Sequence, residues 1–281
     1  MIASLAAEFR KLRKRPAVLT AIAVWLVLAV VFGYVFPYFS YTGLDDAASA
    51  EQRAAALQGL LQALPDSLGP TSVRGLPIFA GALAILLGVL SAGSEHGWRT
   101  QKMILTQGPS RTSVLAGKVA SLVALLLGII ACSFVLNAVA GVVVVGAADR
   151  AIVWPGIVDL LAALGGGLLI GAVWCAFGVF VATLLRGTAL PIGLGLVWCL
   201  AVENLLRAGV EIPVLGTLQQ YTPGSAGGSL VAALGAVPQN AGGTPGITEG
   251  LGGATATAVL FGYLALLVGG TLSLTRRRDV E

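Results

Sequence analysis

Few side chains in this sequence could perform catalysis or bind a metal ion. There is one histidine, His96, and the three cysteines are far from it and from one another: Cys132, Cys175 and Cys199. One histidine cannot build a His-based zinc site, and no serine has a histidine in a plausible partner position. Each cysteine lies inside an apolar run, where we interpret it as a small packing residue. We therefore expect no catalytic residue and no metal site.

Nucleotide and nucleic-acid binding are also disfavoured. The sequence has no Gly-x-x-x-x-Gly-Lys-Ser/Thr loop, the motif whose backbone amides hold nucleotide phosphates. The formal net charge is +4, from 17 basic and 13 acidic residues, but the basic residues stand beside apolar runs. Such placement is typical of cytoplasmic segments next to membrane spans. We expect no nucleic-acid partner and no cofactor in this chain.

Residues 94–113 have the composition of a docking surface. A short helix is predicted over residues 97–107, where a Gly-Pro pair ends it. Trp98, Ile104 and Leu105 would give this helix an apolar surface that water does not favour. The helix should dock either on the inner face of the membrane or on a soluble partner, and composition alone leaves both open.

Three polar side chains lie inside apolar runs: Asn137, Glu203 and Asn204. A carboxylate at mid-bilayer costs about 2.5–3.5 kcal/mol, and less near an interface. Glu203 could reach the headgroups, or it could face a central cavity and bind a cationic group or close an outer gate. Asn137 could tie two helices together or contact a ligand.

The segments that carry these residues are apolar. Of the 281 residues, 57% are hydrophobic and 11% are charged, with a mean hydropathy of +0.90. A soluble domain carries about 25% charged residues, so a soluble globular enzyme is excluded. The apolar blocks also lack the alternation of β-barrel strands. The sequence predicts an all-α polytopic membrane protein with a single transmembrane domain over residues 1–281.

Six apolar runs are candidates to cross about 30 Å of hydrocarbon. The predicted spans are residues 17–36, 76–91, 119–145, 158–185, 188–206 and 255–275. A cleaved signal peptide is the alternative for the first run. This run is longer than the apolar region of a signal peptide, and an aromatic belt follows it. In the fourth span, residues 165–167 and Gly171 are glycines that allow a close helix approach.

The basic residues predict the orientation of the chain. With the N-terminus inside, 13 of the 17 Lys and Arg residues fall in cytoplasmic segments. The remaining four would lie outside: Arg53, Arg74, Arg150 and Arg207. The positive-inside rule therefore favours cytoplasmic N- and C-termini. The high Ala and Gly content suggests a GC-rich bacterial genome, so we expect a bacterial plasma (inner) membrane.

Shorter elements flank the spans. Residues 1–15 predict a basic amphipathic helix in the inner headgroup layer. Outside, an Ala-rich helix is predicted within residues 46–64. The extracellular segment 207–254 contains two apolar pieces, residues 212–218 and 229–234, that are too short to span. They predict short re-entrant helices, and the Gly-rich remainder predicts a flexible link.

The segment 94–113 also carries an ordered motif. It reads Glu95-x-Gly97-x-Arg99-Thr100, then Pro109-Ser110-Arg111 and Lys118. This order resembles the coupling segment of ABC-2 type transporter permeases, although Gly97-Trp98-Arg99-Thr100 stands where Gly-Thr-x-Arg is usual. The basic N-terminal helix, the six spans, the short apolar pieces after the fifth span and the basic C-terminal end also resemble this family.

The resemblance implies the membrane-spanning permease subunit of an ATP-driven exporter. Two copies of the chain would form the path, and two separate ATPase subunits would bind ATP and Mg²⁺. In this family the coupling segment contacts the ATPase, which implies these coupling residues: Glu95, Gly97, Trp98, Arg99, Thr100, Ile104, Leu105, Pro109 and Arg111. Asn137, Glu203 and Asn204 are the candidates for the transport path.

Two other classes of function remain open. The chain could be a non-transporting membrane scaffold or immunity protein that binds a peptide or a lipid. A secondary multidrug carrier is a third possibility, but the sequence lacks membrane-embedded carboxylates suited to proton coupling. Co-purification with an ATPase would distinguish the exporter from both.

Overall fold

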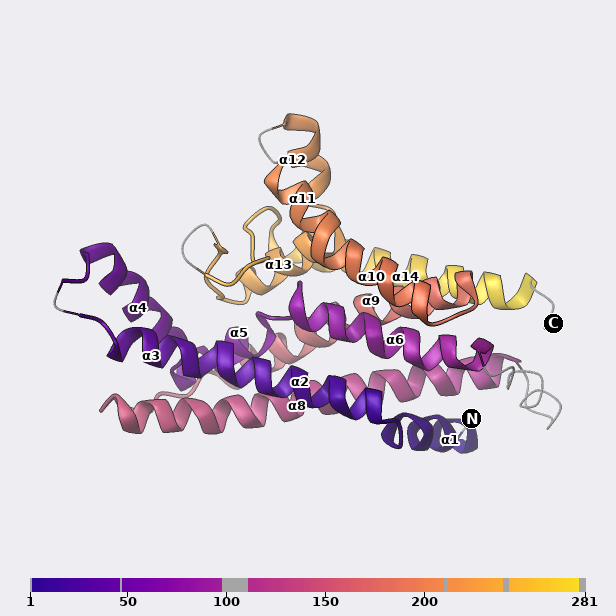
Figure 1. Cartoon of the computed structure of the whole chain (residues 1–281), viewed down its shortest axis with the longest axis horizontal. Coiled ribbons are helices and arrows are strands. Elements are labelled where there is room, and N and C mark those ends of the chain that lie inside the picture. The colour runs from indigo at the N-terminus through magenta and orange to yellow at the C-terminus, as the bar shows by residue number, and fades with distance from the viewer. Residues whose placement is uncertain (1, 46, 98–110, 210–211, 240–242, 278–281) are drawn as a thin grey trace.

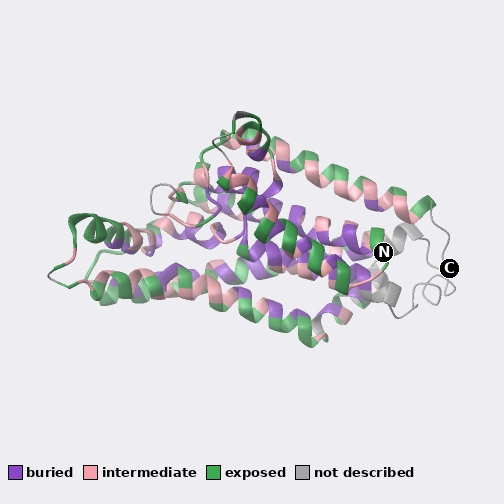
Figure 2. Ribbon diagram, turned by 45° about the horizontal axis from the view of Figure 1, so that its top comes forward, coloured by how far each residue is buried: buried purple, intermediate pink, exposed green. Residues whose placement is uncertain are grey.

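The structure is a computed structural model that describes residues 2–45, 47–97, 111–209, 212–239 and 243–277 (Figure 1). The described residues form helices and connecting segments without any strand, so the predicted all-α class is confirmed. Most of the long helices run along the longest axis of the molecule (Figure 1). Buried residues gather in the middle of this bundle, and the outer faces are mostly exposed or half-exposed (Figure 2).

Five helical segments of the described chain are long and apolar enough to cross a membrane. They are Pro16–Thr42, Ala116–Ala147, Ile157–Leu185, Ala189–Ala208 and Gly253–Arg277. Each corresponds to a predicted span, and the first continues beyond the predicted end at residue 36. The chain is therefore a multi-pass membrane protein.

The first of these segments is a continuous rod made of three parts. α2, Pro16–Val30, passes into a π-helical turn, η1, Val31–Val35, and then into α3, Phe36–Thr42. Pro37 follows directly after this π-helical turn. Inside a continuous helix a proline removes one backbone hydrogen bond, and an irregular turn is where such a residue is accommodated. The rod therefore continues through the proline at which the predicted span ends.

The fifth predicted span is built in the same way. α10, Ala189–Leu196, passes into a second π-helical turn, η3, Val197–Val202, and then into α11, Glu203–Ala208. α11 and the following α12, Pro213–Gln219, project from the rest of the bundle (Figure 1). Single π-helical turns of this kind are rare in helices and frequent at functional sites.

The predicted second span corresponds to α6, Phe79–Gly97. Its apolar part, Phe79–Gly93, is shorter than the other five candidates. α6 packs against α9, Ile157–Leu185, in the centre of the molecule, and most of its described side chains are buried. Because protein rather than lipid covers α6, its stability comes from helix packing.

Glycines bring α6 and α9 together backbone to backbone. A Cβ atom on Gly88 would collide with the carbonyl oxygen of Cys175, and one on Gly178 would collide with that of Ile85. A larger residue at either position would therefore force the two helices apart. Gly88 and Gly178 therefore allow the backbones of α6 and α9 to touch.

The glycines predicted to allow a close helix approach in α9 differ from one another. A Cβ atom on Gly165 would meet open space, and one on Gly171 would make only ordinary contacts. Gly167 does pack closely, but against the side chain of Val73 in α5, Leu68–Val73. Gly166 also packs closely, since its Cβ atom would meet Leu234 Cδ1 at 2.9 Å. The predicted close approach is therefore confirmed at Gly166 and Gly167, and the contact with α6 lies at Gly178 instead.

α1, Ile2–Arg13, forms the predicted N-terminal helix and packs against α8, Arg111–Ala147. Leu12 is buried at 2% exposure. Glu8 is also buried, and its carboxylate pairs with the Lys11 ammonium at 2.7 Å. α1 is therefore attached to the helical bundle itself, in addition to any contact with headgroups.

At the other end of the molecule, α4, Ala50–Gln62, confirms the helix predicted within residues 46–64. A capping box begins this helix: the Gln52 N–H donates to the Ser49 hydroxyl at 3.2 Å, and the Ser49 N–H donates to the Gln52 side chain at 2.8 Å. A 3-10 turn, Pro65–Ser67, then leads to α5.

The predicted short helices after the fifth span are α12 and α13, Pro223–Ala233. α13 is buried over most of its length and packs against α14, Gly253–Arg277, and against α9. The prediction of a flexible link after it is wrong where the structure describes this segment. Ile247 is buried at 1% exposure, and its carbonyl accepts a hydrogen bond from the Gln239 N–H at 3.0 Å.

Candidate functional site

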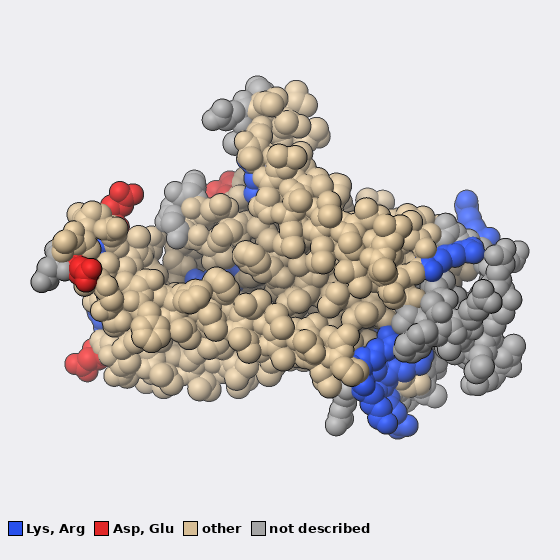
Figure 3. Space-filling view, in the orientation of Figure 1, with Lys and Arg blue, Asp and Glu red and all other residues tan. Residues whose placement is uncertain are grey.

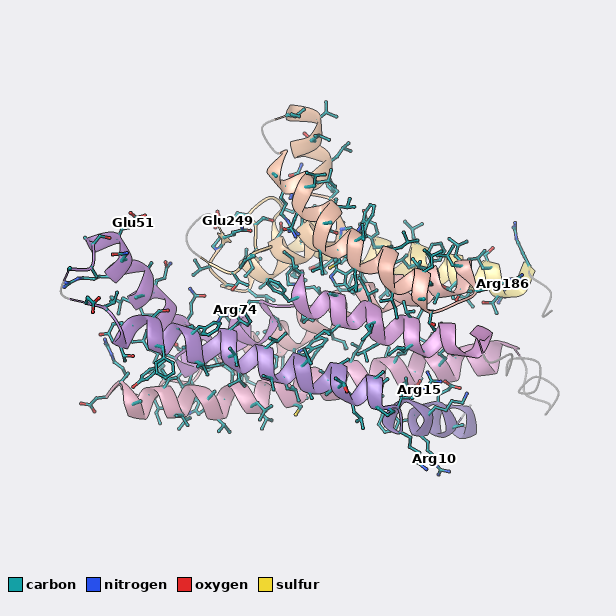
Figure 4. All side chains as sticks on the ribbon, viewed as in Figure 1. Arg10, Arg15, Glu51, Arg74, Arg186 and Glu249 are labelled. Atoms are coloured by element: carbon teal, nitrogen blue, oxygen red, sulfur yellow. The ribbon has the colours of Figure 1, made fainter. Side chains whose placement is uncertain are left out.

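Basic residues and several helix ends meet at one end of the molecule. α1, the last turns of α6, the start of α8 and the end of α14 lie there together (Figure 1). Most Lys and Arg side chains visible in Figure 3 gather at this end, and the visible Asp and Glu side chains lie toward the opposite end. Figure 4 labels Arg10, Arg15 and Arg186 at this end. We call it the basic end.

The predicted coupling residues belong to the basic end as far as the structure describes them. Glu95 and Gly97 lie in the last turns of α6, and Arg111 begins α8. The other six lie outside the described residues: Trp98, Arg99, Thr100, Ile104, Leu105 and Pro109. The described ends of α6 and α8 thus delimit the predicted coupling segment.

Specific contacts join the helices of the basic end. The Arg15 guanidinium, at the junction of α1 and α2, donates a hydrogen bond at 2.6 Å to the carbonyl oxygen of Leu90 in α6. Lys118 lies in α8 and is buried at 6% exposure. Together with the packing of α1 on α8, the hydrogen bond of Arg15 joins α6 to the helices at the N-terminal end of the chain.

Asn137 connects two helices. It is fully buried in α8, and its Nδ2 atom donates a hydrogen bond at 3.0 Å to the hydroxyl of Ser72 in α5. Its Oδ1 atom has no hydrogen-bond partner among the described residues. The structure therefore places this side chain between helices, in agreement with the first of the two predicted alternatives.

Glu203 is buried inside the protein at 0% exposure. One carboxylate oxygen accepts a hydrogen bond from the Gly224 N–H at 2.9 Å, and the other pairs with an Arg207 guanidinium nitrogen at 3.2 Å. The carboxylate thus pairs with a cationic group of its own chain, and the two predicted alternatives, the headgroups and a central cavity, stay predictions.

Asn204 lies beside this ion pair and is exposed. Its Oδ1 atom accepts a hydrogen bond from Arg207 at 2.8 Å, and its Nδ2 atom donates to the Leu200 carbonyl at 2.7 Å. Arg207 therefore holds both neighbouring side chains of α11. Asn204 contributes to the same cluster rather than acting as an independent site.

A cavity of about 870 Å³ lies among the α2–α3 rod, α4, α5 and the start of α6. Asn137, Glu203 and Asn204 do not line it. Its walls are largely apolar, and its polar side chains include Gln62, Thr71 and Arg74. This is the size of a cleft that holds a small molecule.

Arg74 is the basic residue of the cavity wall. One guanidinium nitrogen donates to the carbonyl oxygen of Phe32 at 2.7 Å, and the other terminal nitrogen donates to Gln62 Oε1 at 3.2 Å. Within the described chain, no carboxylate lies at ion-pair distance from Arg74. Burial lowers the pKa of this guanidinium, because its charged form loses hydration.

The comparison with known families decides the identity of this bundle. The family model of the ABC-2 family transporter proteins matches residues 2–280. The chain belongs to the ABC-2 transporter family. This confirms the resemblance inferred from residues 94–118 and makes the chain the transmembrane subunit of a transporter. A search of the curated proteins found no match.

Membership of the ABC-2 family fits the helical bundle and its basic end. Transmembrane subunits of this family are generally not catalytic, and they associate with ABC ATPase partners. Family membership therefore favours a transporter subunit over the two alternative functions, the scaffold and the secondary carrier. The family match by itself identifies neither the substrate nor the residues that bind it.

The cavity of this ABC-2 subunit is the feature that sequence reasoning misses. The sequence places Arg74 among the outer-loop cations, because this residue stands shortly before a predicted span. One signal in the sequence favours a different position: Arg74 lies between Val73 and Gly75, and Leu76 follows, so it has an apolar context with no charged neighbour. The cavity itself requires the tertiary arrangement of several helices and cannot be read from any single segment.

Proposed function

We propose that this ABC-2 subunit is the membrane permease of an ATP-driven exporter, working as two copies of the chain with two ATPase subunits. The observation that carries the proposal is the family match over residues 2–280. The absence of a nucleotide-binding loop from the sequence supports separate ATPase subunits, which would hold ATP and Mg²⁺.

The proposed topology has six spans, with α6 as the second, and both termini in the cytoplasm of a bacterial cell. An odd number of spans would put the N- and C-terminal helix ends on opposite sides of the membrane. Instead, α1 and the end of α14 lie together at the basic end (Figure 1). The gathering of basic side chains there supports a cytoplasmic position for this end (Figure 3).

In this topology, α12 and α13 belong to the extracellular side. The exposed apolar residues of α12 include Val214 and Leu218, which supports a position at or within the outer leaflet. α13 is covered by α9 and α14, so protein shields its backbone groups in the way a re-entrant helix requires.

The proposed coupling surface is the segment 94–113 at the basic end. ATP-driven closure of the partner subunits would displace this segment and shift the permease between inward-facing and outward-facing states. Arg15 and Leu90 connect α6 to the α1–α2 junction, and α1 packs on α8. These contacts support transmission from the coupling segment into several helices together.

The polar residues that the sequence assigns to the path have a supporting role in this proposal. Asn137 joins α8 to α5, and Glu203 joins α11 to α13. Such contacts would be made or broken as the helices change position. Asn204 is the exposed member of the group, so it is the candidate to face the second copy of the chain or the path.

Reconstitution tests the proposed function. The full chain, expressed with a candidate ABC ATPase from the same genome, should co-purify with that ATPase and support ATP hydrolysis in proteoliposomes. A permease that purifies alone and changes no ATPase activity would contradict the exporter and favour the scaffold. A chain that moves solutes with an ion gradient but without ATP would favour the secondary carrier.

A further inference from the structure

We propose that the cavity beside the α2–α3 rod binds an amphiphile with one anionic headgroup, whose acidic group is held by Arg74 and whose hydrocarbon chain lies between the rod and α6. The proposal does not depend on the proposed function, because such a molecule could bind to a permease or to a scaffold.

The apolar part of the cavity fits a hydrocarbon chain. Its walls include aromatic and aliphatic side chains of the rod and of α6: Trp25, Leu28, Phe32, Phe36, Phe79 and Leu83. A volume of about 870 Å³ lies within the range of about 300–1,000 Å³ that is usual for small-molecule sites. Burial of apolar ligand surface against these walls would supply most of the binding free energy.

The cavity reaches the surface of the molecule between the rod and α6. Phe32, Phe36 and Phe79 line it, and their exposed fractions are 57%, 52% and 50%. The Phe32 ring stacks on that of Phe79 with centroids 6.4 Å apart, and it meets Phe36 edge to face at 5.1 Å. Because the rod is long and apolar enough to cross a membrane and Phe79–Gly93 is an apolar helix, an amphiphile could enter from the lipid.

The polar part of the cavity contains a cation without a counter-ion among the described residues. Arg74 has five N–H donors, and its two hydrogen bonds go to the neutral oxygens of Phe32 and Gln62. Figure 4 labels Arg74 beside the rod, away from the basic end that holds the labelled Arg10 and Arg15. A half-buried guanidinium with spare donors binds a carboxylate or a phosphate more strongly than it binds water.

The charge of the cavity selects among amphiphiles. Asp45 also lines it, but this residue is exposed and so is screened by water. A cationic amphiphile would be repelled by Arg74, and a neutral one would cover the guanidinium without neutralising it. A single anionic group satisfies the charge, so anionic amphiphiles should be preferred over zwitterionic ones.

Quenching by brominated acyl chains tests this inference, because Trp25 lies in the cavity wall. The purified full chain would be titrated in detergent with dibrominated oleate, phosphatidylglycerol and phosphatidylcholine. The signal from Trp25 would be isolated by comparison with a Trp25→Phe variant. We expect saturable quenching by at least one anionic probe, with at least about tenfold weaker binding of phosphatidylcholine.

Substitutions at two positions test the role of the cavity, so that misfolding of one variant does not decide the result. Arg74→Gln should weaken binding of the anionic probe about tenfold or more, and Arg74→Lys should restore part of it. Gly75 lines the cavity and has open space at its Cβ, so Gly75→Leu should block binding while leaving Arg74 in place. Arg53→Gln, on the exposed surface of α4, is the matched control.

The outcomes test two separate questions: whether the site exists, and whether its ligand is a bilayer lipid or a free acid. Arg74-dependent quenching by phosphatidylglycerol would support a bilayer lipid, and Arg74-dependent quenching by oleate alone would support a free acid. Equal quenching by all three probes, or anionic binding unchanged in both Arg74→Gln and Gly75→Leu, would overturn the proposal. The assay contains no ATPase, so loss of ATPase coupling would not affect it.

Discussion

The carboxylate of Glu203 accepts a hydrogen bond at 2.9 Å from the backbone N–H of Gly224, a residue 21 positions later in the chain. This contact, with the Arg207 ion pair, fastens the projecting α11 to the start of α13. A Cβ atom on Gly224 would collide with the carboxylate. α13 is therefore attached to α11 through the buried carboxylate of Glu203.

The Glu203 cluster predicts a large loss of stability when one charge is removed. Glu203→Gln should leave the Arg207 guanidinium buried without a counter-ion, a change that typically costs about 3–5 kcal/mol. Thermal unfolding of the detergent-purified chain measures the loss, and Asn204→Ala on the exposed side of the helix should cost far less. Unchanged unfolding of Glu203→Gln would show that the pair contributes nothing to the fold.

The contact between α6 and α9 predicts a sharp dependence on side-chain size. Gly88→Ala and Gly178→Ala should each force the helices apart and cost about 1–3 kcal/mol or more, because the collisions are with backbone atoms. Gly165→Ala, in the same helix as Gly178 but facing open space, should be neutral. Size-exclusion profiles and unfolding temperatures compare the three, and equal behaviour would argue against a backbone-to-backbone approach of these helices.

The coupling segment predicts a specific loss of ATPase binding. Trp98→Ala should remove an aromatic anchor of the proposed interface, which commonly costs about 2 kcal/mol or more, or roughly 30-fold in affinity. Lys102→Ala should remove only a charge, whose effect decreases at high salt. Co-purification of the ATPase measures both, and full binding by Trp98→Ala would place this segment on the membrane instead.

The proposed topology predicts which sites are labelled from outside intact cells. In a variant whose native cysteines are replaced, a cysteine at Glu249 should react with an impermeant maleimide, and one at Asp279 should not. Cys132 must be among those replaced, because it is exposed. Labelling in the reverse pattern would invert the orientation, and labelling of both sites would show that α14 does not cross the membrane.

The helices can be predicted from the sequence because length and apolar composition decide whether a segment can cross a membrane. α4 can be predicted as well, because its leucines lie at helical spacing. The family can be inferred because the motif in residues 94–118 is a local sequence pattern, and the family match over residues 2–280 confirms the inference. These features depend on residues close together in the chain.

The remaining features depend on residues that are far apart in the chain. The environment of Glu203 requires Gly224, and the environment of Arg74 requires the carbonyl of Phe32. No local pattern predicts such partners, because a buried charge and a headgroup-facing charge look alike in a single segment. For the same reason, the glycine pattern of the fourth span predicts a close contact but not the helix face that makes it.

The backbone contact between α6 and α9 limits how this transporter subunit can change shape. Since Gly88 and Gly178 leave no layer of side chains to slide or repack, these two helices should move as one rigid body. Rearrangement must then be absorbed elsewhere, and the two π-helical turns, Val31–Val35 and Val197–Val202, are the places where the neighbouring rods can act as hinges.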